Sequence, residues 1–305
     1  MNVITRAYDP DSNDFKKICQ FIIQDNQAKK EYFVWQPGRI IDWKYGLWKS
    51  NKYFPNFFRK NSQLWLDCFD ELVGFAISEN GDNMFYIFIK DSYAHLYEVI
   101  VLWVIEHWKN RDGALYTELT EKQTEQMLTL KKHGFVSKGA SEVTRMYNLT
   151  EMETFQPILE DGFELVDMAT HYDPVGLAKL KANAFRNQNS VSEIDLLAYE
   201  YIRESPIYKP EFDLSIINSQ GEYVAGCEAF VDYENQVAEI ERVCTHRAYR
   251  RKGLAKAVIQ ACFHRLRNHG IPTAFITGMS EEAINLYGKI EYAREINRVH
   301  FEFSK

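Results

Sequence analysis

The sequence predicts an α/β (α+β) protein made of two tandem domains. The chain has 305 residues, which is enough for two domains of about 150 residues each. In each half, apolar runs with strand spacing precede apolar residues with helical spacing. Two pairs of similar segments also lie a domain length apart, as a duplication would place them. They are Leu72–Ala76 with Tyr223–Cys227, and Lys131–Phe135 with Gly288–Tyr292.

The first half contains two predicted strands and a helix. Leu72–Ala76 follows a polar turn, and Phe85–Lys90 is rich in aromatic and β-branched residues, so both are expected to be strands. Residues 96–108 have apolar side chains at helical spacing. The connection between the second strand and this helix, residues 91–95, contains neither glycine nor arginine.

In the second half, the pattern changes from strand to helix within a short stretch. Val237–Val243 alternates as a strand does, and the chain breaks over residues 245–249. A helix follows and is expected to end before Gly270 and Pro272, which terminate helices. Its apolar positions are Leu254, Val258, Cys262 and Leu266.

Three more elements are predicted toward the C-terminus. Residues 274–277 form a short strand, residues 280–289 a helix, and residues 292–303 a closing strand. Ser280 is expected to cap this last helix, because a serine oxygen accepts hydrogen bonds from the free amides of the first turn.

The loop between the predicted strand and the long helix has the features of a phosphate-binding loop. The first amides of a helix have no intrahelical partners and lie at the positive end of the dipole, so they attract a diphosphate. Glycine and alanine let the backbone approach closely, and mobile cations surround the anion. We therefore predict that Arg250, Arg251, Lys252, Gly253, Leu254 and Ala255 bind a diphosphate; we call them the phosphate loop.

With this loop and its flanks, roughly residues 162–303 resemble the GNAT superfamily of acetyl-CoA-dependent N-acetyltransferases. The similar features are the acidic pair Glu239 and Glu241, the Arg-x-x-Gly-x-Ala phosphate loop, and the helix 283–289. The sequence departs from the family at Ser280, where asparagine is frequent, and at Glu291, where glycine usually precedes the last aromatic residue.

The resemblance has several implications for fold and ligands. It implies two GNAT-like domains in tandem, each a mixed, mostly antiparallel sheet flanked by helices. It implies acetyl-CoA as co-substrate, no metal, and coenzyme contacts at Ser280. It also places a backbone N–H for the thioester oxygen within Val243, Cys244 and Thr245.

Amide formation needs a base, since an alkyl ammonium with a pKa of about 10 is protonated at neutral pH. Glu239 and Glu241 are two residues apart in a strand, so both point to one face, and either could take the proton directly or through water. The alternative for each is an exposed carboxylate paired with Arg242 or a lysine.

Tyr287 is the predicted general acid. A tyrosine hydroxyl held near the departing thiolate can protonate it. The alternative is a core tyrosine packed with Leu286 and Ile290. Two neighbours are discounted: Cys244 is interpreted as a core thiol rather than a nucleophile, and His246 as a turn residue.

The domain boundaries follow from these motifs. We expect a degenerate GNAT-like domain without a coenzyme loop at residues 1–150, a linker at 151–162 containing Pro157 and Gly162, and the GNAT N-acetyltransferase domain at 163–305. The first domain has Leu130 in the position of Tyr287. Its aromatic stretch from Tyr32 to Phe58 either lines a substrate pocket or belongs to the core.

Composition excludes several classes of protein. Residues 1–150 have equal numbers of acidic and basic residues, so the whole net charge of −7 falls after them, which disfavours nucleic-acid binding. The apolar run Val99–Ile105 is too short to span a membrane, and no signal segment is visible, so we expect a cytoplasmic protein. Five cysteines without a Cys-x-x-Cys pair suggest buried thiols rather than disulfides or zinc ligands.

The sequence therefore predicts an acetyl-CoA-dependent N-acetyltransferase, an acyltransferase in which a primary amine attacks directly in a ternary complex. The acceptor is a small-molecule amine or a peptide, and its identity and the oligomeric state stay open. The alternative is a non-catalytic acyl-CoA-binding regulatory module.

Overall fold

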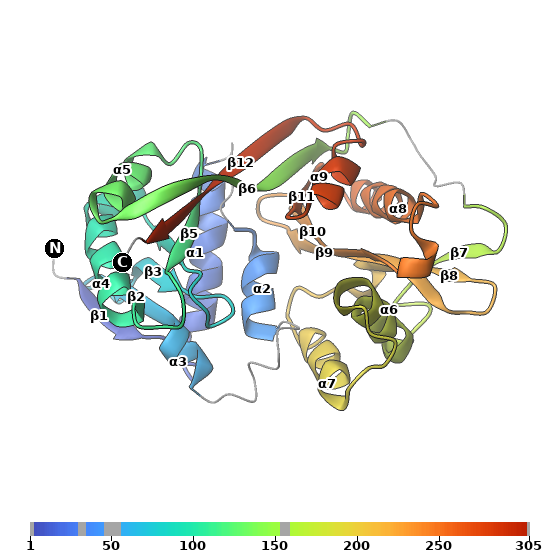
Figure 1. The fold of residues 1–305 in the computed structure, drawn as a ribbon, viewed down its shortest axis with the longest axis horizontal. Coiled ribbons are helices and arrows are strands. Elements are labelled where there is room, and N and C mark those ends of the chain that lie inside the picture. The colour runs from blue at the N-terminus through green and yellow to red at the C-terminus, as the bar shows by residue number, and fades with distance from the viewer. Residues whose placement is uncertain (1–2, 30–34, 46–55, 153–158, 304–305) are drawn as a thin grey trace. The chain divides into compact units, whose positions relative to one another are not determined.

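The computed structural model describes residues 3–29, 35–45, 56–152 and 159–303 (Figure 1). The chain forms two compact units. The first comprises Met1–Val34, Asn51–Val143 and Ile296–Lys305, and the second comprises Trp35–Ser50 and Thr144–Glu295. The strands β6 (Phe135–Asn148) and β12 (Arg294–Phe303) each contribute residues to both units.

These units differ from the predicted division at residues 150 and 163. Residues 35–50 belong to the second unit although they come early in the chain, and residues 296–305 belong to the first. The last residues of the chain belong to the first unit because β12 is one continuous strand and its final residues pair with β5 (Tyr116–Thr120). Residues 153–158 of the predicted linker lie outside the described residues.

The first unit contains an antiparallel sheet in the order β1-β2-β3-β4. Its other elements are helices, residues 135–143 of β6, and the antiparallel pair of β5 with residues 298–302 of β12. The elements are β1 (Ile4–Ala7), α1 (Asp14–Lys29), α3 (Phe57–Asn61), β2 (Ser62–Leu66), β3 (Leu72–Ile77), β4 (Tyr86–Ile89), η2 (Asp91–Leu96), α4 (Tyr97–Trp108) and α5 (Thr124–Lys132).

The predicted strands and helix of this half are confirmed as β3, β4 and α4. Ile100, Val101 and Val104 of α4 are fully buried in a core shared with strand residues such as Trp65 and Phe85. The segment that follows β4 is the 3₁₀ helix η2, which leads directly into α4.

The second unit contains strands in the order β6-β11-β10-β9-β8-β7. Strands β7 to β10 pair antiparallel, and β10 pairs parallel with β11. The elements are α2 (Pro37–Tyr45), β7 (Phe163–Asp167), α6 (Pro174–Arg186), α7 (Glu193–Ile202), η3 (Pro210–Phe212), β8 (Asp213–Asn218), β9 (Tyr223–Asp232), β10 (Val237–Thr245), η4 (Arg247–Tyr249), α8 (Leu254–Asn268), β11 (Thr273–Gly278) and α9 (Glu281–Tyr287).

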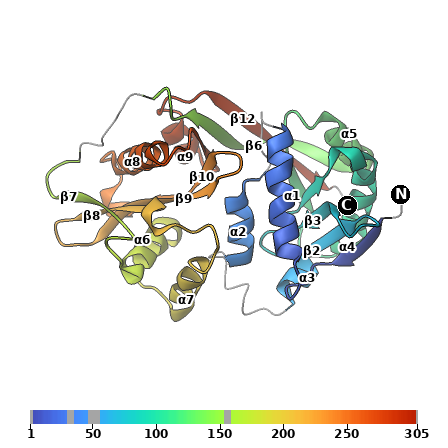
Figure 2. The same cartoon turned by 180° about the vertical axis from the view of Figure 1, so that it is seen from behind.

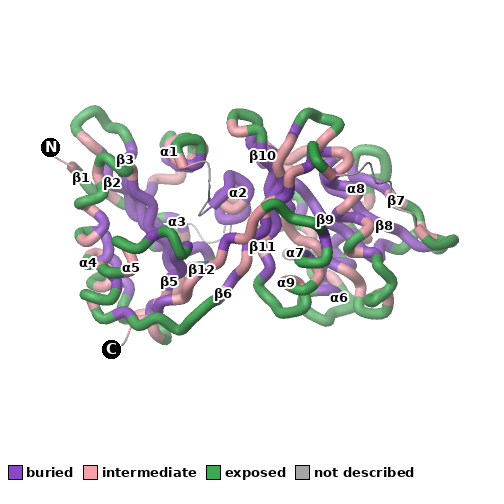
Figure 3. Tube along the Cα trace, turned by 90° about the horizontal axis from the view of Figure 1, so that it is seen from above, coloured by how far each residue is buried: buried purple, intermediate pink, exposed green. Residues whose placement is uncertain are grey.

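Helices cover both faces of this sheet. Helices α8 and α9 lie on one face, and α6 and α7 lie on the other (Figures 1 and 2). Val258 and Cys262 of α8 are fully buried against strand residues such as Ile240, whereas Leu180 of α6 and Tyr199 of α7 belong to a separate core on the opposite face. Burial is continuous along β8 and β9, as Figure 3 shows.

The predicted elements of the second half are also confirmed, as β10, α8, β11, α9 and β12. Gly270 has φ 79° just beyond the end of α8, a left-handed conformation that glycine adopts readily. Ser280 caps α9 as expected, because its hydroxyl accepts from the Ala283 N–H at 3.2 Å.

Two other expectations are settled by burial. Trp35, Trp43 and Phe58 are buried, so these members of the aromatic stretch are core residues, while residues 30–34 and 46–55 lie outside the described part. The expectation of five buried thiols is wrong for Cys68, which is exposed, and for Cys19, which is partly exposed.

Within the described ranges, no helix is both long and apolar enough to cross a bilayer. The same residues contain no cluster of three or more His, Cys, Asp or Glu side chains arranged to hold a metal ion.

Candidate functional site

The centre of the candidate site is the place where β10 separates from β11. The parallel ladder runs from Val237↔Thr273 to Ile240↔Ile276, whereas β10 stays paired with β9 as far as Thr245↔Ala225. A β-bulge lies between Glu241 and Cys244 in the β9 ladder. The second half of β10 therefore has one paired edge and one edge directed away from β9.

Thr245 directs its backbone groups to that second edge. In an antiparallel ladder, successive residues point their N–H and C=O groups to opposite sides. The His246 N–H donates to Val224 O of β9 at 2.9 Å, so the groups of the preceding residue point away from β9. This position agrees with the predicted stretch Val243 to Thr245 for a backbone donor, whose role stays a prediction.

The N-terminus of α8 is open to solvent. Gly253 is the N-cap, with φ 78°, and a Cβ built on it meets no atom within 4 Å. Arg251 also adopts a left-handed conformation, with φ 64°. Leu254 is buried and anchors the start of the helix, whereas Ala255 is half-buried. The first amides of a 15-residue helix are thus presented at an exposed turn, as anion binding requires.

The three basic side chains of the phosphate loop are exposed and have different surroundings. Arg250 donates through Nη2 to Ala184 O at 3.1 Å. Lys252 Nζ lies 5.5 Å from the ring centre of Tyr249 and 5.7 Å from that of Phe163. Arg250 is therefore held by α6, while Lys252 rests over aromatic rings with its charge near the helix start.

Glu239 and Glu241 both precede the bulge, in register with Phe230 and Glu228 of β9, so both belong to the same face of the sheet. They differ in burial. Glu239 is only 7% exposed and lies against α2, whereas Glu241 is partly exposed at the end of the regular ladder. Solvent exposure therefore favours Glu241 over Glu239 for exchanging a proton with an acceptor.

The closeness of α2 to Glu239 predicts an effect on stability. A Cβ on Gly38 would lie 2.5 Å from Oε2 of Glu239 and 3.0 Å from Cβ of Phe230. We expect Gly38→Ala to destabilise the protein by about 1–3 kcal/mol, the usual cost of overpacking. Urea unfolding measures this, and the double variant Gly38→Ala with Glu239→Ala should recover part of the loss. Unchanged stability of Gly38→Ala would contradict the packing described.

Tyr287 differs from the other buried tyrosines of the second unit. It is 6% exposed, and its carbonyl accepts from the Tyr147 hydroxyl at 2.9 Å. Over the described part of the chain, its own hydroxyl has no hydrogen-bond partner, although a core tyrosine usually has one. By contrast, protein oxygens accept hydrogen bonds from the hydroxyls of the buried tyrosines Tyr147, Tyr199 and Tyr223.

The surroundings of Tyr287 keep it protonated. Burial raises the pKa of its hydroxyl well above the usual value, and the charge of Glu241 raises it further. Cys227 and Cys244 contribute in the same direction. The hydroxyl is therefore a proton donor, and not a phenolate, at neutral pH.

Cys244 and His246 are placed as expected for residues without a catalytic role. Cys244 is buried in the core on the α6 face, and burial raises the pKa of its thiol to about 12, which disfavours the nucleophilic thiolate. His246 caps the 3₁₀ helix η4, where its Nδ1 accepts from the Ala248 N–H at 3.3 Å.

An ionic cluster that the sequence did not predict lies beside the bulge. Arg242 contacts the carboxylates of Asp42 in α2 and Glu228 in β9. Lys181 Nζ of α6 lies 3.0 Å from Oε2 of Glu228. Burial lowers the pKa of Lys181 to about 8, so this lysine depends on its carboxylate neighbours to stay charged.

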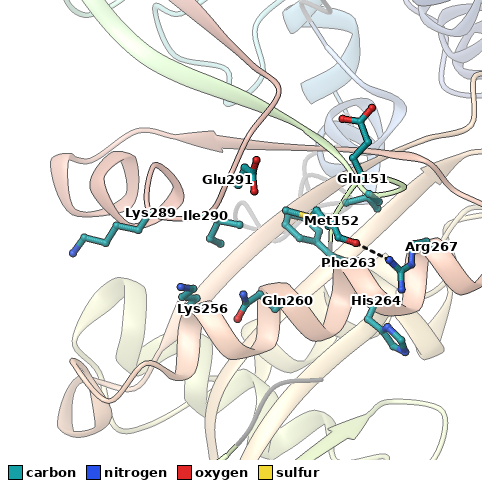
Figure 4. Close-up of a pocket in the computed structure, with 11 residues that line it drawn as sticks. Glu151, Met152, Lys256, Gln260, Phe263, His264, Arg267, Lys289, Ile290 and Glu291 are labelled. Carbon is teal, nitrogen blue, oxygen red and sulfur yellow. Dashed lines mark hydrogen bonds between the residues drawn. The ribbon is translucent and has the colours of Figure 1, made fainter. Parts of the chain in front are cut away.

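A cavity of about 270 Å³ lies along the outer side of α8 (Figure 4). Lys256, Gln260 and Phe263 line it from α8, Met152 from the segment after β6, and Glu291 from the connection after α9. None of the predicted site residues lines this cavity.

One family model, described as Acetyltransferase (GNAT) family, matches residues 176–292. This range contains every predicted catalytic and coenzyme-binding residue. A search of curated proteins found no match to the chain.

Several solved structures have a similar fold over the whole chain. A GCN5-related N-acetyltransferase from Sphaerobacter thermophilus has a TM-score of 0.64 and 15% identity, covering 98% of this chain and 95% of that one. A tandem GNAT protein from the clavulanic acid biosynthesis pathway has a TM-score of 0.63 and 10% identity, covering 100% and 99%. An acetyltransferase of the GNAT family from Colwellia psychrerythraea has a TM-score of 0.60 and 14% identity, covering 100% of both chains. At these identities the likeness establishes the fold, which is a tandem GNAT fold.

Proposed function

We propose, from the match of residues 176–292 to the model of the GNAT acetyltransferase family, that the chain transfers an acetyl group from acetyl-CoA to a primary amine by direct attack. Family and fold support an acyl-CoA-dependent acetyltransferase in general. The observation that supports catalysis most is the Tyr287 hydroxyl, which is protonated and has no protein partner among the described residues.

The residues at the start of α8 fit the coenzyme's diphosphate. The exposed first amides would accept it as hydrogen-bond donors, and Gly253 leaves room for close approach. Arg251 and Lys252 would add positive charge from the exposed turn. The Ser280 hydroxyl oxygen caps α9, and Ser280 also hydrogen-bonds the carboxylate of Glu282, whose pKa is lowered by its own backbone N–H and by this bond; a coenzyme contact at Ser280 would replace this bond.

The coenzyme supplies an acetyl thioester, whose carbonyl is open to attack by a neutral amine. We assign removal of the amine proton to Glu241, directly or through water, because it is the more exposed of the acidic pair. The backbone N–H of Thr245 is the candidate donor to the carbonyl oxygen, since it points away from β9. Tyr287 would give its proton to the departing sulfur. The acceptor in this proposal is a small-molecule amine or a peptide.

The raised pKa of Tyr287 predicts the pH dependence of turnover. A group with a raised pKa stays protonated until the pH passes its usual value of about 10. We expect kcat to rise with pH as the base and the amine lose their protons, and to show no decrease below about pH 10 from ionisation of Tyr287. A pH profile of kcat tests this. An alkaline decrease below that pH that disappears in Tyr287→Phe would contradict the assignment.

The proposed function is tested by measuring thiol release from acetyl-CoA with a panel of primary amines. Turnover with at least one amine, at a rate above hydrolysis in the absence of acceptor, supports the enzyme. Coenzyme binding without turnover on any amine or peptide of the panel would instead support a non-catalytic acyl-CoA-binding module.

A further inference from the structure

Arg242 occupies the bulge of β10 in an unfavourable conformation. Its φ is 52°, in the left-handed region that non-glycine residues rarely adopt. Ile240 is the last residue of β10 that pairs with β11, and Glu241 is the last that pairs with β9 before the bulge. The bulge begins directly after Glu241. The conformation of this one residue therefore sets where the end of β10 points.

The side chain of Arg242 is buried and held by acidic groups from two other elements. It is 8% exposed and contacts Asp42 of α2 and Glu228 of β9, which are 12% and 2% exposed. Lys181 of α6 pairs with the second carboxylate oxygen of Glu228, Oε2. A guanidinium can hydrogen-bond two carboxylates in fixed directions, which a lysine cannot do.

A buried ionic cluster of this kind adds little net stability, because desolvation offsets most of the attraction. The cluster instead fixes the position of the Arg242 side chain relative to α2, α6 and β9. Asp42 is separated from Arg242 by 200 residues along the chain. It reaches the bulge only because α2 belongs to the second unit.

We propose that Asp42, Glu228 and Lys181 are positioning residues that hold the Arg242 side chain and thereby keep the bulge in its left-handed conformation. The bulge in turn directs the backbone of Thr245 toward the thioester. The early segment of the chain that contains α2 thus completes the site of the GNAT domain. This inference rests on the function proposed above.

Asp42→Asn removes one charge at nearly constant volume and is the first test. We expect kcat with acetyl-CoA to fall by about 10- to 100-fold, since small misplacements of reacting groups have effects of this size. The Kd for CoA should change less than threefold, because the variant leaves every residue of the phosphate loop unchanged. Asp42→Glu should restore part of the lost kcat.

Arg242→Gly gives a second readout. Glycine adopts the left-handed conformation without strain, so this variant can still form the bulge. It loses the contacts of the Arg242 side chain with Asp42 and Glu228. We expect the same loss of kcat as in Asp42→Asn, and little further loss when the two changes are combined. Equal kcat in wild type and in folded Asp42→Asn and Arg242→Gly would overturn the inference.

A matched control is Asp167→Asn, which breaks another partly buried ion pair of the same unit, with Arg265. It should lower stability without altering kcat. A loss of kcat in Asp167→Asn equal to that in Asp42→Asn would also overturn the inference, because it would show a general structural effect. Failure of the wild type to bind CoA or to release thiol would overturn the proposed function itself, which distinguishes the two failures.

Discussion

Replacing Tyr287 with phenylalanine is expected to lower kcat by about 10²- to 10⁴-fold, the range found when a general acid is removed. The change deletes one oxygen that has no protein partner within the described residues, so the fold should tolerate it. The pKa of the hydroxyl is raised by burial, so the proton lost in the variant is one that the wild type holds throughout the neutral range.

The measurement is steady-state thiol release together with the Kd for CoA. We expect the Kd to stay within about twofold of wild type, since the phosphate loop is unchanged. Tyr223→Phe is the matched control, because Tyr223 is a buried tyrosine of a separate core and its hydroxyl donates to the carbonyl of His171. It should lower stability by about 1 kcal/mol and leave kcat nearly unchanged. Wild-type kcat in Tyr287→Phe would remove the tyrosine from the mechanism.

Gly253→Asp is expected to weaken CoA binding by about 100-fold. A carboxylate placed within a few ångströms of the diphosphate repels it by several kcal/mol at an effective dielectric constant of about 20, and solvent reduces this by roughly half. Aspartate is tolerated at helix N-caps and in left-handed conformations, and a Cβ at this position meets open space, so the helix should persist.

Gly253→Ala separates the effect of charge from that of the Cβ. It should weaken CoA binding by less than Gly253→Asp, because it places a Cβ on a left-handed residue but adds no negative charge. Isothermal titration calorimetry with both variants tests this ordering. Equal affinities of Gly253→Asp and wild type would show that the diphosphate binds elsewhere.

The sequence was sufficient to predict those parts of the site that are built from consecutive residues. The alternation of β10 and the apolar spacing of α8 are local patterns, so the exposed loop between them could be placed at Gly253. The Ser280 cap of α9 could be predicted for the same reason. In the first half, β3, β4 and α4 followed from their own periodicity.

The remainder depends on contacts between distant residues or on backbone geometry. No local pattern links Asp42 to Arg242, because only the packing of α2 brings them together. The bulge was not predictable, since its left-handed residue is an arginine rather than glycine or asparagine. Glu239 and Glu241 alternate in the same way along the strand, so the sequence does not distinguish their burial. The tertiary structure buries Glu239 beneath α2 and leaves Glu241 partly exposed.

The central claim is that the N-terminus of α8 binds the diphosphate of the coenzyme. Calorimetric titration of the wild type with 3′-dephospho-CoA, which has the diphosphate, and with pantetheine, which lacks both the diphosphate and the adenosine, tests this claim most directly when repeated with Gly253→Asp, because the substitution acts on the diphosphate and not on the adenosine. The account predicts that the wild type binds the diphosphate compound at least about 100-fold more tightly and that Gly253→Asp loses most of this preference. Equal affinity of the wild type for both compounds, or a preference that persists unchanged in Gly253→Asp, would contradict it.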